Sequence, residues 1–173
     1  AYGLTKANET SKNKNLARFE SIQNNFSLLN PRFLDELSTV CKKENISLLP
    51  YSPIAGGVLS GKYNNAFYPE DARFSAYMKH ENPRVQAQAT RFVNDKTIAA
   101  TIKYLELARE YGISPVTLAV AYSKHFDFVA STIIGARTSE QLDESLKAFN
   151  FAIDNELLSK IELIQKEILY PMG

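Results

Sequence analysis

Two short segments of the sequence carry residue types that could bind the rings and phosphates of a nucleotide. The first, YSPIAGGVLSGKY at 51–63, follows a short apolar run that is typical of a buried strand. Tyr51 could offer its ring face to a flat heteroaromatic ring, Ser52 and two adjacent glycines would let backbone groups approach a ligand, and Lys62 would supply a positive charge. A Pro-Gly turn beside a core tyrosine explains the same residues equally well.

The second segment, IGARTSEQLDES at 134–145, ends a predicted strand at Gly135 and begins a helix about three residues later. Free N–H groups and the helix dipole attract anions at such a terminus, and Arg137 adds a forked donor that suits phosphate. Gln141 and Glu144 lie in the first two helical turns, within reach of an adenosine. An ordinary capping box with a solvated arginine is the more frequent explanation of this pattern.

The elements that must position these segments alternate between strand and helix. Short apolar runs predict strands at 17–23, 46–51 and 128–134. Helices are predicted from Asn30-Pro31, from Asp95 to near Gly112, from Ser114-Pro115 to Lys124, from Thr138 to Ala148, and around 157–168. Ile98, Ile102, Leu105 and Ala108 have the spacing of a buried helix face. The stretch 52–95 is weakly periodic and reads as a long loop, and loops of that length are often lids or binding loops.

This alternation indicates an α/β protein with parallel β/α units. Three parallel strands alone leave two open edges, so the pattern favours an incomplete β/α barrel or an incomplete doubly wound sheet. Periodicity does not choose between these two architectures.

Composition narrows the classes of function. The 173 residues fit one domain or a large piece of one, and 20 basic against 19 acidic residues predict no general affinity for nucleic acid or an anionic membrane. No apolar run is long enough for a transmembrane helix. The single cysteine, Cys41, excludes an internal disulfide and suits a reducing compartment, so we expect a cytoplasmic protein. His80 and His125 have no metal-ligand spacing, so no metal site is predicted.

Three stretches together resemble the C-terminal half of an aldo-keto reductase, of the long-loop branch that includes bacterial reductases and potassium-channel β subunits. They are SIQNNFSLLN (21–30), LLPYSPIAGGVLSGKY (48–63) and STIIGARTSEQLDESL (131–146), and their order and spacing also agree. The resemblance implies the C-terminal part of a (β/α)₈ TIM barrel, with about three parallel strands and outer helices. Residues 1–173 would form a single partial domain, in which 52–95 is a long loop covering the cofactor.

The resemblance also implies NADPH as the cofactor and assigns roles to residues in this sequence. Gln23 would bond the nicotinamide carboxamide, Tyr51 would stack on the ring, and Lys62 would lie near the phosphates. Further matches are Ser52, Pro53, Ile54, Ala55 and Gly57 along the pyrophosphate, Arg73 further along that loop, and Gly135, Arg137, Gln141 and Glu144 around the 2′-phosphate and adenine. Ser145 stands where the family usually has asparagine, and serine is too short to replace both amide groups.

The family's catalytic Asp, Tyr, Lys and His come from the first half of the barrel, and none of their motifs occurs in this sequence. We therefore predict no catalytic residue here, and expect the missing N-terminal half of the barrel as a partner. The complete protein would reduce a small carbonyl substrate, an aldehyde or ketone, with NADPH. The alternatives are an NADPH-binding regulatory subunit similar to potassium-channel β subunits, or a truncated, inactive product. A homo-oligomer is a further expectation, because the strand edges are open.

Overall fold

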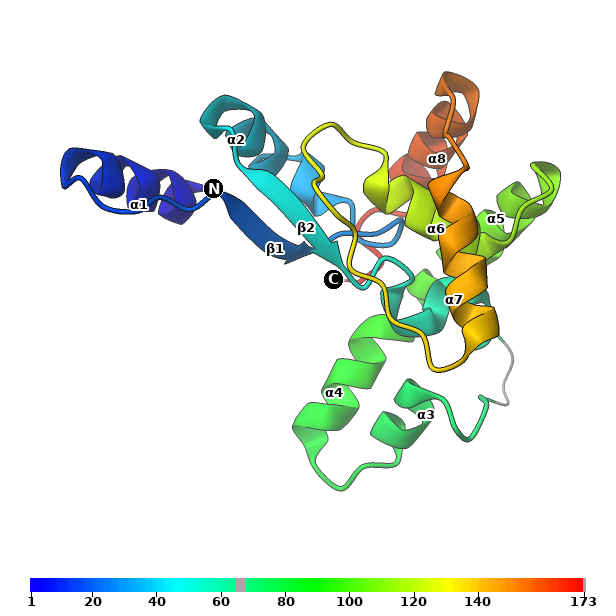
Figure 1. Ribbon diagram of the computed structural model, residues 1–173. Helices are drawn as coiled ribbons and strands as arrows, with labels where there is room; N and C mark the ends of the chain where they lie inside the picture. Colours follow the sequence, from blue (N-terminus) through cyan, green and yellow to red (C-terminus); the bar gives the residue numbers. More distant parts are fainter. Residues whose placement is uncertain (65–67, 173) are drawn as a thin grey trace.

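The computed structural model describes residues 1–64 and 68–172 (Figure 1). Within these residues, two parallel strands form the only regular sheet. Strand β1 (Ser21–Asn25) pairs with β2 (Ser47–Tyr51), with Ser21 opposite Ser47 and Asn25 opposite Tyr51. Their connection carries η1 (Arg32–Leu34) and α2 (Leu37–Glu44). The first predicted strand is therefore real but begins at 21, whereas 17–20 lie outside it.

The predicted third strand, 128–134, lies parallel to β2 on its other edge, but it is not a regular strand. Leu48 N donates to Phe128 O at 2.7 Å, and Ile133 N donates to Pro50 O at 2.8 Å. The parallel bridges join Leu48 to Val129 and Tyr51 to Ile133. The five residues from Val129 to Ile133 thus lie opposite the four from Leu48 to Tyr51, and the extra residue interrupts the ladder as a bulge does. The expectation of a buried strand was wrong here, since Ile133 is 40% exposed.

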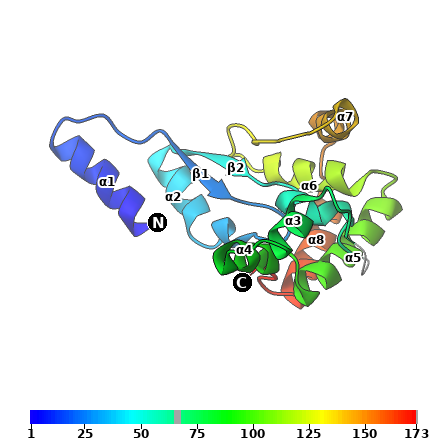
Figure 2. The same cartoon turned by 90° about the horizontal axis from the view of Figure 1, so that it is seen from below.

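Helices surround this sheet and make up most of the molecule. Their bounds are α1 (Tyr2–Asn13), η2 (Ala55–Ser60), α3 (Arg73–Met78), α4 (Pro83–Phe92), α5 (Asp95–Glu110), α6 (Pro115–Lys124), α7 (Ser139–Leu146), η3 (Lys147–Phe149) and α8 (Asn155–Glu167). Helix α1 extends to one side of the sheet, away from the other helices, in both views (Figures 1 and 2). It is joined to the chain before β1 by Asn8, whose amide group bonds the backbone N–H and C=O of Phe19 at 2.9 and 3.2 Å.

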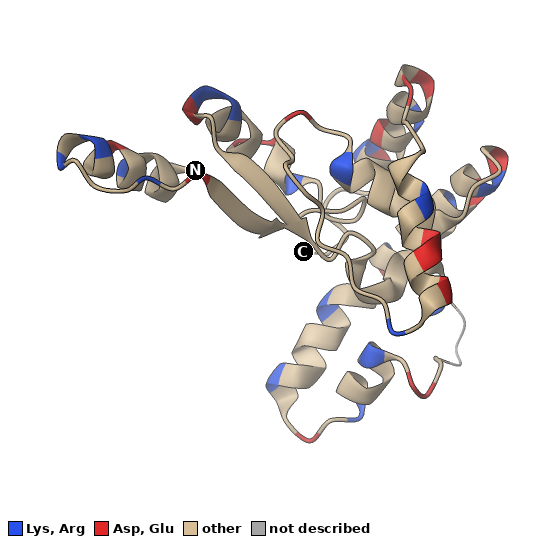
Figure 3. Ribbon diagram, in the orientation of Figure 1, with Lys and Arg blue, Asp and Glu red and all other residues tan. Residues whose placement is uncertain are grey.

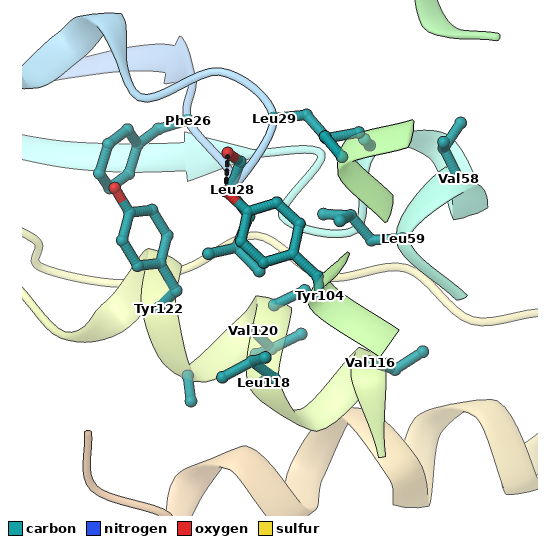
Figure 4. Close-up of a cluster of buried hydrophobic side chains, with 14 of the residues drawn as sticks. Phe26, Leu28, Leu29, Val58, Leu59, Tyr104, Val116, Leu118, Val120 and Tyr122 are labelled. Carbon is teal, nitrogen blue, oxygen red and sulfur yellow. Dashed lines mark hydrogen bonds between the residues drawn. The ribbon is translucent and has the colours of Figure 1, made fainter. Parts of the chain in front are cut away.

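The hydrophobic core lies between α5, α6, η2 and the turn that follows β1 (Figure 4). Phe26 packs against Tyr122, with ring centroids 5.5 Å apart. The hydroxyl of Tyr104 donates to Leu28 O at 3.2 Å, and thus satisfies a polar group inside the core. Burial raises the pKa of both Tyr104 and Tyr122 far above the ordinary tyrosine value, so both are neutral structural residues.

The stretch 52–95 contains η2, α3 and α4 among its described residues, so the expectation of a long loop was wrong; its residues 65–67 lie outside the described part. An aromatic cluster holds α3 and α4 against η2. Phe74 stacks on Phe92 with centroids 4.9 Å apart, and the Tyr63 hydroxyl accepts from Phe74 N at 3.2 Å. Asn82 caps α4 by accepting from Arg84 N, a start signal that periodicity alone did not reveal.

Helix α5 differs from its prediction in both its cap and its buried face. Asn94, not Asp95, is the N-cap, in a reciprocal box with Thr97. The residues that pack inward are Thr97, Ala100, Thr101, Tyr104, Leu107 and Ala108, whereas Ile102 is 44% exposed. Helix α6 begins at Pro115 with Ser114 as its cap, as predicted. None of the helices described is long and apolar enough to cross a membrane.

Candidate functional site

A cleft of about 650 Å³ opens where β2 ends. Its walls come from the turn after Tyr51, from Lys62, Pro69 and residues 71–73, from the chain between Ile133 and α7, and from Val120 of α6. Both segments that suggested nucleotide binding therefore meet in one place. The predicted site residues that line the cleft are Tyr51, Ser52, Pro53, Ile54, Gly57, Lys62, Arg73, Gly135, Arg137, Gln141 and Ser145.

The turn after Tyr51 is built from backbone conformations that few side chains tolerate. Ser52 has φ 56° and Ala55 has φ 49°, both in the left-handed region that is strained for residues with a Cβ. A Cβ at Gly56 would lie 2.7 Å from the Phe74 ring, and one at Gly57 would lie 2.6 Å from Lys62 Cε. At Gly56 the Phe74 ring leaves no room for a side chain, whereas at Gly57 the end of Lys62 could move aside and the φ of +97° is what favours glycine.

Two backbone N–H groups of this turn donate hydrogen bonds to carbonyl oxygens of the same turn. Ala55 N donates to Ser52 O at 2.8 Å, and Gly57 N donates to Ile54 O at 2.9 Å. Those two N–H groups are therefore not free to bind a ligand. What a ligand meets here is the shape of the backbone and the ring of Tyr51, which is 40% exposed. Such an exposed ring at a strand end is a surface on which a flat heteroaromatic ring can stack.

Charge is concentrated in the cleft, although the chain as a whole carries only +1. The lining includes three cations, Lys62, Arg73 and Arg137, and one carboxylate, Asp71. The pKa of Lys62 is lowered, chiefly by partial burial and also by the two arginines, while Asp71 opposes the shift. Figure 3 shows the wider distribution of charge over the ribbon, with basic and acidic residues interspersed on the outer helices. The excess of positive charge suits an anionic ligand.

The start of α7 forms one corner of the cleft. Arg137 Nη1 donates to Asp71 O at 2.8 Å and lies 3.4 Å from Asp71 Oδ2. Thr138 caps the helix by accepting from Gln141 N. The side chain of Gln141 accepts from Arg137 N at 3.0 Å instead of from Thr138 N, so the predicted capping box is shifted by one residue.

Three predicted site residues do not line the cleft. Gln23 lies in β1 opposite Leu49, two residues before the strand ends, and is exposed. Ala55 is fully buried beneath the turn. The backbone oxygen of Glu144 accepts from Thr117 Oγ1 at 3.1 Å, which ties α7 to α6.

Ser145 lines the cleft, and its hydroxyl donates to Gln141 O at 3.0 Å within the helix. The hydroxyl proton is thus engaged, and the group can only accept from a ligand. An asparagine at this position could both donate and accept, so serine offers this wall of the cleft one donor fewer.

Some lining residues were not predicted from the sequence. Ile133 and Ile134 precede Gly135 directly, so their place beside the glycine was a signal that could have identified them. Val120 comes from the middle of α6, and its sequence context is that of any buried helix residue. The other unpredicted members are Pro69, Asp71, Ala72 and Ala136, whereas Gly56 is one of the two adjacent glycines expected to let a ligand approach. Within the described residues, no cluster of three or more His, Cys, Asp and Glu side chains could hold a metal ion.

Comparison with known proteins places this arrangement in a family. The model of the aldo/keto reductase family matches residues 2–166. Protein tas of Escherichia coli (strain K12) is 32% identical over 171 residues, which is 99% of this chain and 47% of that protein. A probable voltage-gated potassium channel subunit beta of Arabidopsis thaliana is 33% identical over 121 residues, or 69% of this chain and 35% of that protein.

A solved structure shows the same fold. The glycerol dehydrogenase of Gluconobacter oxydans superposes with a TM-score of 0.68 at 22% sequence identity, covering 91% of this chain and 45% of that one. The chain therefore spans about half the length, or less, of these relatives.

Proposed function

This chain belongs to the aldo/keto reductase family of oxidoreductases, and on that premise we propose that it is the cofactor-holding part of an NADPH-dependent reductase of aldehydes and ketones. The observation that carries the proposal is the cleft itself. An exposed aromatic ring at a strand end and three cations share one cavity, and these are the groups that a nicotinamide ring and a set of phosphates require.

The residues present fit NADPH in their order along the cleft. The nicotinamide would lie on Tyr51 and the pyrophosphate along the turn, where a Cβ at Gly57 would displace Lys62. The 2′-phosphate would reach Arg137 and the start of α7. Bound NADPH supplies the hydride, and the protein binds and orients it.

Reduction of a carbonyl also needs a proton donor, and we assign that role to none of the described residues of the cleft. Tyr63 is close by, but burial raises its pKa and its hydroxyl accepts from Phe74 N. We propose that the donor and the rest of the (β/α)₈ barrel come from a part corresponding to the half of the relatives that this chain does not match. In this proposal residues 1–173 form one partial domain, and 52–95 covers the cofactor.

The cytoplasm is the proposed compartment, because the single cysteine, Cys41, is reduced and buried.

A regulatory role is the second candidate, and the similarity to a potassium channel subunit beta favours it. Such a protein would bind NADPH and a partner without rapid turnover. Turnover of an aldehyde by the complete protein would support the reductase. Tight NADPH binding without turnover, together with a stable complex with a channel, would support the regulatory subunit.

The test of the proposed function is a titration of the complete protein with NADPH, in which binding is followed by the fluorescence of the reduced nicotinamide. Tyr51→Ala should weaken binding by about five-fold, because an aromatic stack contributes roughly 1 kcal/mol. Tyr2→Ala is the matched control, since Tyr2 is an exposed tyrosine on α1, outside the cleft. Equal affinity of wild type and both variants would remove Tyr51 from the site, and no binding at all would overturn the proposal.

A further inference from the structure

The unpredicted carboxylate of the cleft, Asp71, is in contact with the arginine expected to select NADPH. We propose that Asp71 is a specificity-determining residue, which competes with the 2′-phosphate of NADPH for the guanidinium of Arg137 and so narrows the preference for NADPH over NADH. This inference rests on the proposed function, because it concerns the cofactor of that same cleft.

The contact joins two walls of the cleft that are far apart in the sequence. Arg137 Nη1 donates to Asp71 O at 2.8 Å and is 3.4 Å from Asp71 Oδ2. Both side chains are largely exposed, at 70% and 79%, so solvent can reach each of them. An exposed ion pair is weak, and a doubly charged phosphate can displace the carboxylate. The pair therefore competes with the ligand for Arg137 and does not exclude it.

The backbone N–H of Arg137 is also engaged, because it donates to Gln141 Oε1 at 3.0 Å. From Arg137 itself, a 2′-phosphate can therefore be bound only by the guanidinium. Anything that holds the guanidinium elsewhere consequently reduces the affinity for that phosphate. Lys62 and Arg73 also line the cleft, yet Asp71 bonds Arg137 and not either of them among the described residues.

The two cofactors differ at the 2′ position in a way that Asp71 distinguishes. A carboxylate accepts a hydrogen bond from the ribose 2′-hydroxyl of NADH, whereas an arginine accommodates the 2′-phosphate of NADPH. The same carboxylate repels a phosphate. In this cleft the carboxylate of Asp71 and the guanidinium of Arg137 are in contact with each other. Asp71 thus lowers the affinity for NADPH, and leaves that for NADH unchanged or slightly raised.

Substitution of the carboxylate tests this competition. Asp71→Asn keeps the size of the side chain and the backbone oxygen that Arg137 contacts, and removes the charge. The ratio of NADH to NADPH dissociation constants should rise about three- to five-fold, the scale of one exposed charge pair. Adenosine 2′,5′-bisphosphate and adenosine 5′-monophosphate, which differ only in the 2′-phosphate, should show the same change when they are measured by their displacement of NADPH.

Glu70→Gln is the matched control, because it removes the same charge one residue away and Glu70 does not line the cleft. It should leave the ratio unchanged. In an Arg137→Ala background, Asp71→Asn should alter the ratio much less, since the competition requires the guanidinium and only direct repulsion between Asp71 and the phosphate remains.

Three outcomes would overturn the inference while the proposed function stands. If Asp71→Asn lost equal affinity for both cofactors, the contact of Asp71 with Arg137 would serve only to hold the two walls of the cleft together. Equal effects of Asp71→Asn and Glu70→Gln, or an effect of Asp71→Asn that is undiminished without Arg137, would show only electrostatic repulsion of the phosphate. Absence of binding by the wild type would instead overturn both proposals.

Discussion

The two ends of the cleft are built in different ways. At the Tyr51 end, the backbone makes the shape: Gly56 and Gly57 have positive φ, a Cβ at Gly56 would meet the Phe74 ring, and Val58 and Leu59, which follow them, are buried. At the Arg137 end, exposed side chains form the surface, and the segment 129–133 that precedes them pairs irregularly with β2. A site fixed by backbone geometry tolerates few substitutions, whereas a site made of exposed charges can change its ligand preference by single substitutions.

The largest effect is expected where the Tyr51 end meets the aromatic cluster. Gly56→Ala would place a Cβ 2.7 Å from the Phe74 ring at a φ of +64°, and that ring is stacked on Phe92. We expect a loss of about 2–4 kcal/mol in the free energy of unfolding, from backbone strain and overpacking together. Chemical denaturation measures it.

Gly3→Ala is the control for this substitution. Gly3 lies in α1, and a Cβ added there would meet nothing within 4 Å, so alanine should stabilise the helix by about 0.5–1 kcal/mol. If both variants changed stability by similar amounts, the close approach at Gly56 would not constrain the turn.

At the other end of the cleft, Arg137→Ala should leave stability nearly unchanged and alter cofactor choice. We expect the affinity for NADPH to fall on the order of ten-fold and that for NADH to fall far less, because only NADPH carries the 2′-phosphate. Parallel titrations of the two cofactors measure this, with Arg84→Ala on α4 as a control outside the cleft. Equal losses for both cofactors would show that Arg137 serves only the structure of its turn.

The sequence predicted the Tyr51 end well, since the signals there are local. A short apolar run, a terminal tyrosine and closely spaced glycines follow one another, and the structure keeps all of them at one strand end. The parallel neighbours of β2 were also predicted correctly. In each case the pattern and the backbone requirement lie within a few residues of each other.

The features that were missed depend on partners distant in sequence. The extra residue between Val129 and Ile133 has meaning only against the register of β2. Helix α3 is short, and the packing of Phe74 on Phe92 supports it. Asp71 reads as one more loop carboxylate until its contact with Arg137, 66 residues later, is known. Periodicity within a window carries none of this information.

The smallest predicted effect is a pH dependence of NADPH binding, which arises from Lys62 and is influenced by charges at both ends of the cleft. Lys62 lies against Gly57, and its pKa is lowered by burial and by the two arginines, while Asp71 raises it. A lysine attracts phosphate only while protonated, that is, below its pKa. The contribution of Lys62 to NADPH binding should therefore be complete near neutral pH, and should be lost on the alkaline side earlier than for an ordinary lysine.

Titrations with NADPH at rising pH should accordingly show a few-fold decline in affinity that Lys62→Gln abolishes. Lys103→Gln should retain the decline, because Lys103 pairs with Glu167 outside the cleft. Substitution of Asp71 or of Arg137 should shift the midpoint of this pH-dependent decline in opposite directions. Asp71→Asn removes the group that raises the pKa, so the decline should begin at lower pH, whereas Arg137→Ala removes a repelling cation and should delay it. Midpoints that stayed in place in both variants would mean that the Arg137 end does not influence Lys62, and that the two ends bind their parts of the cofactor independently.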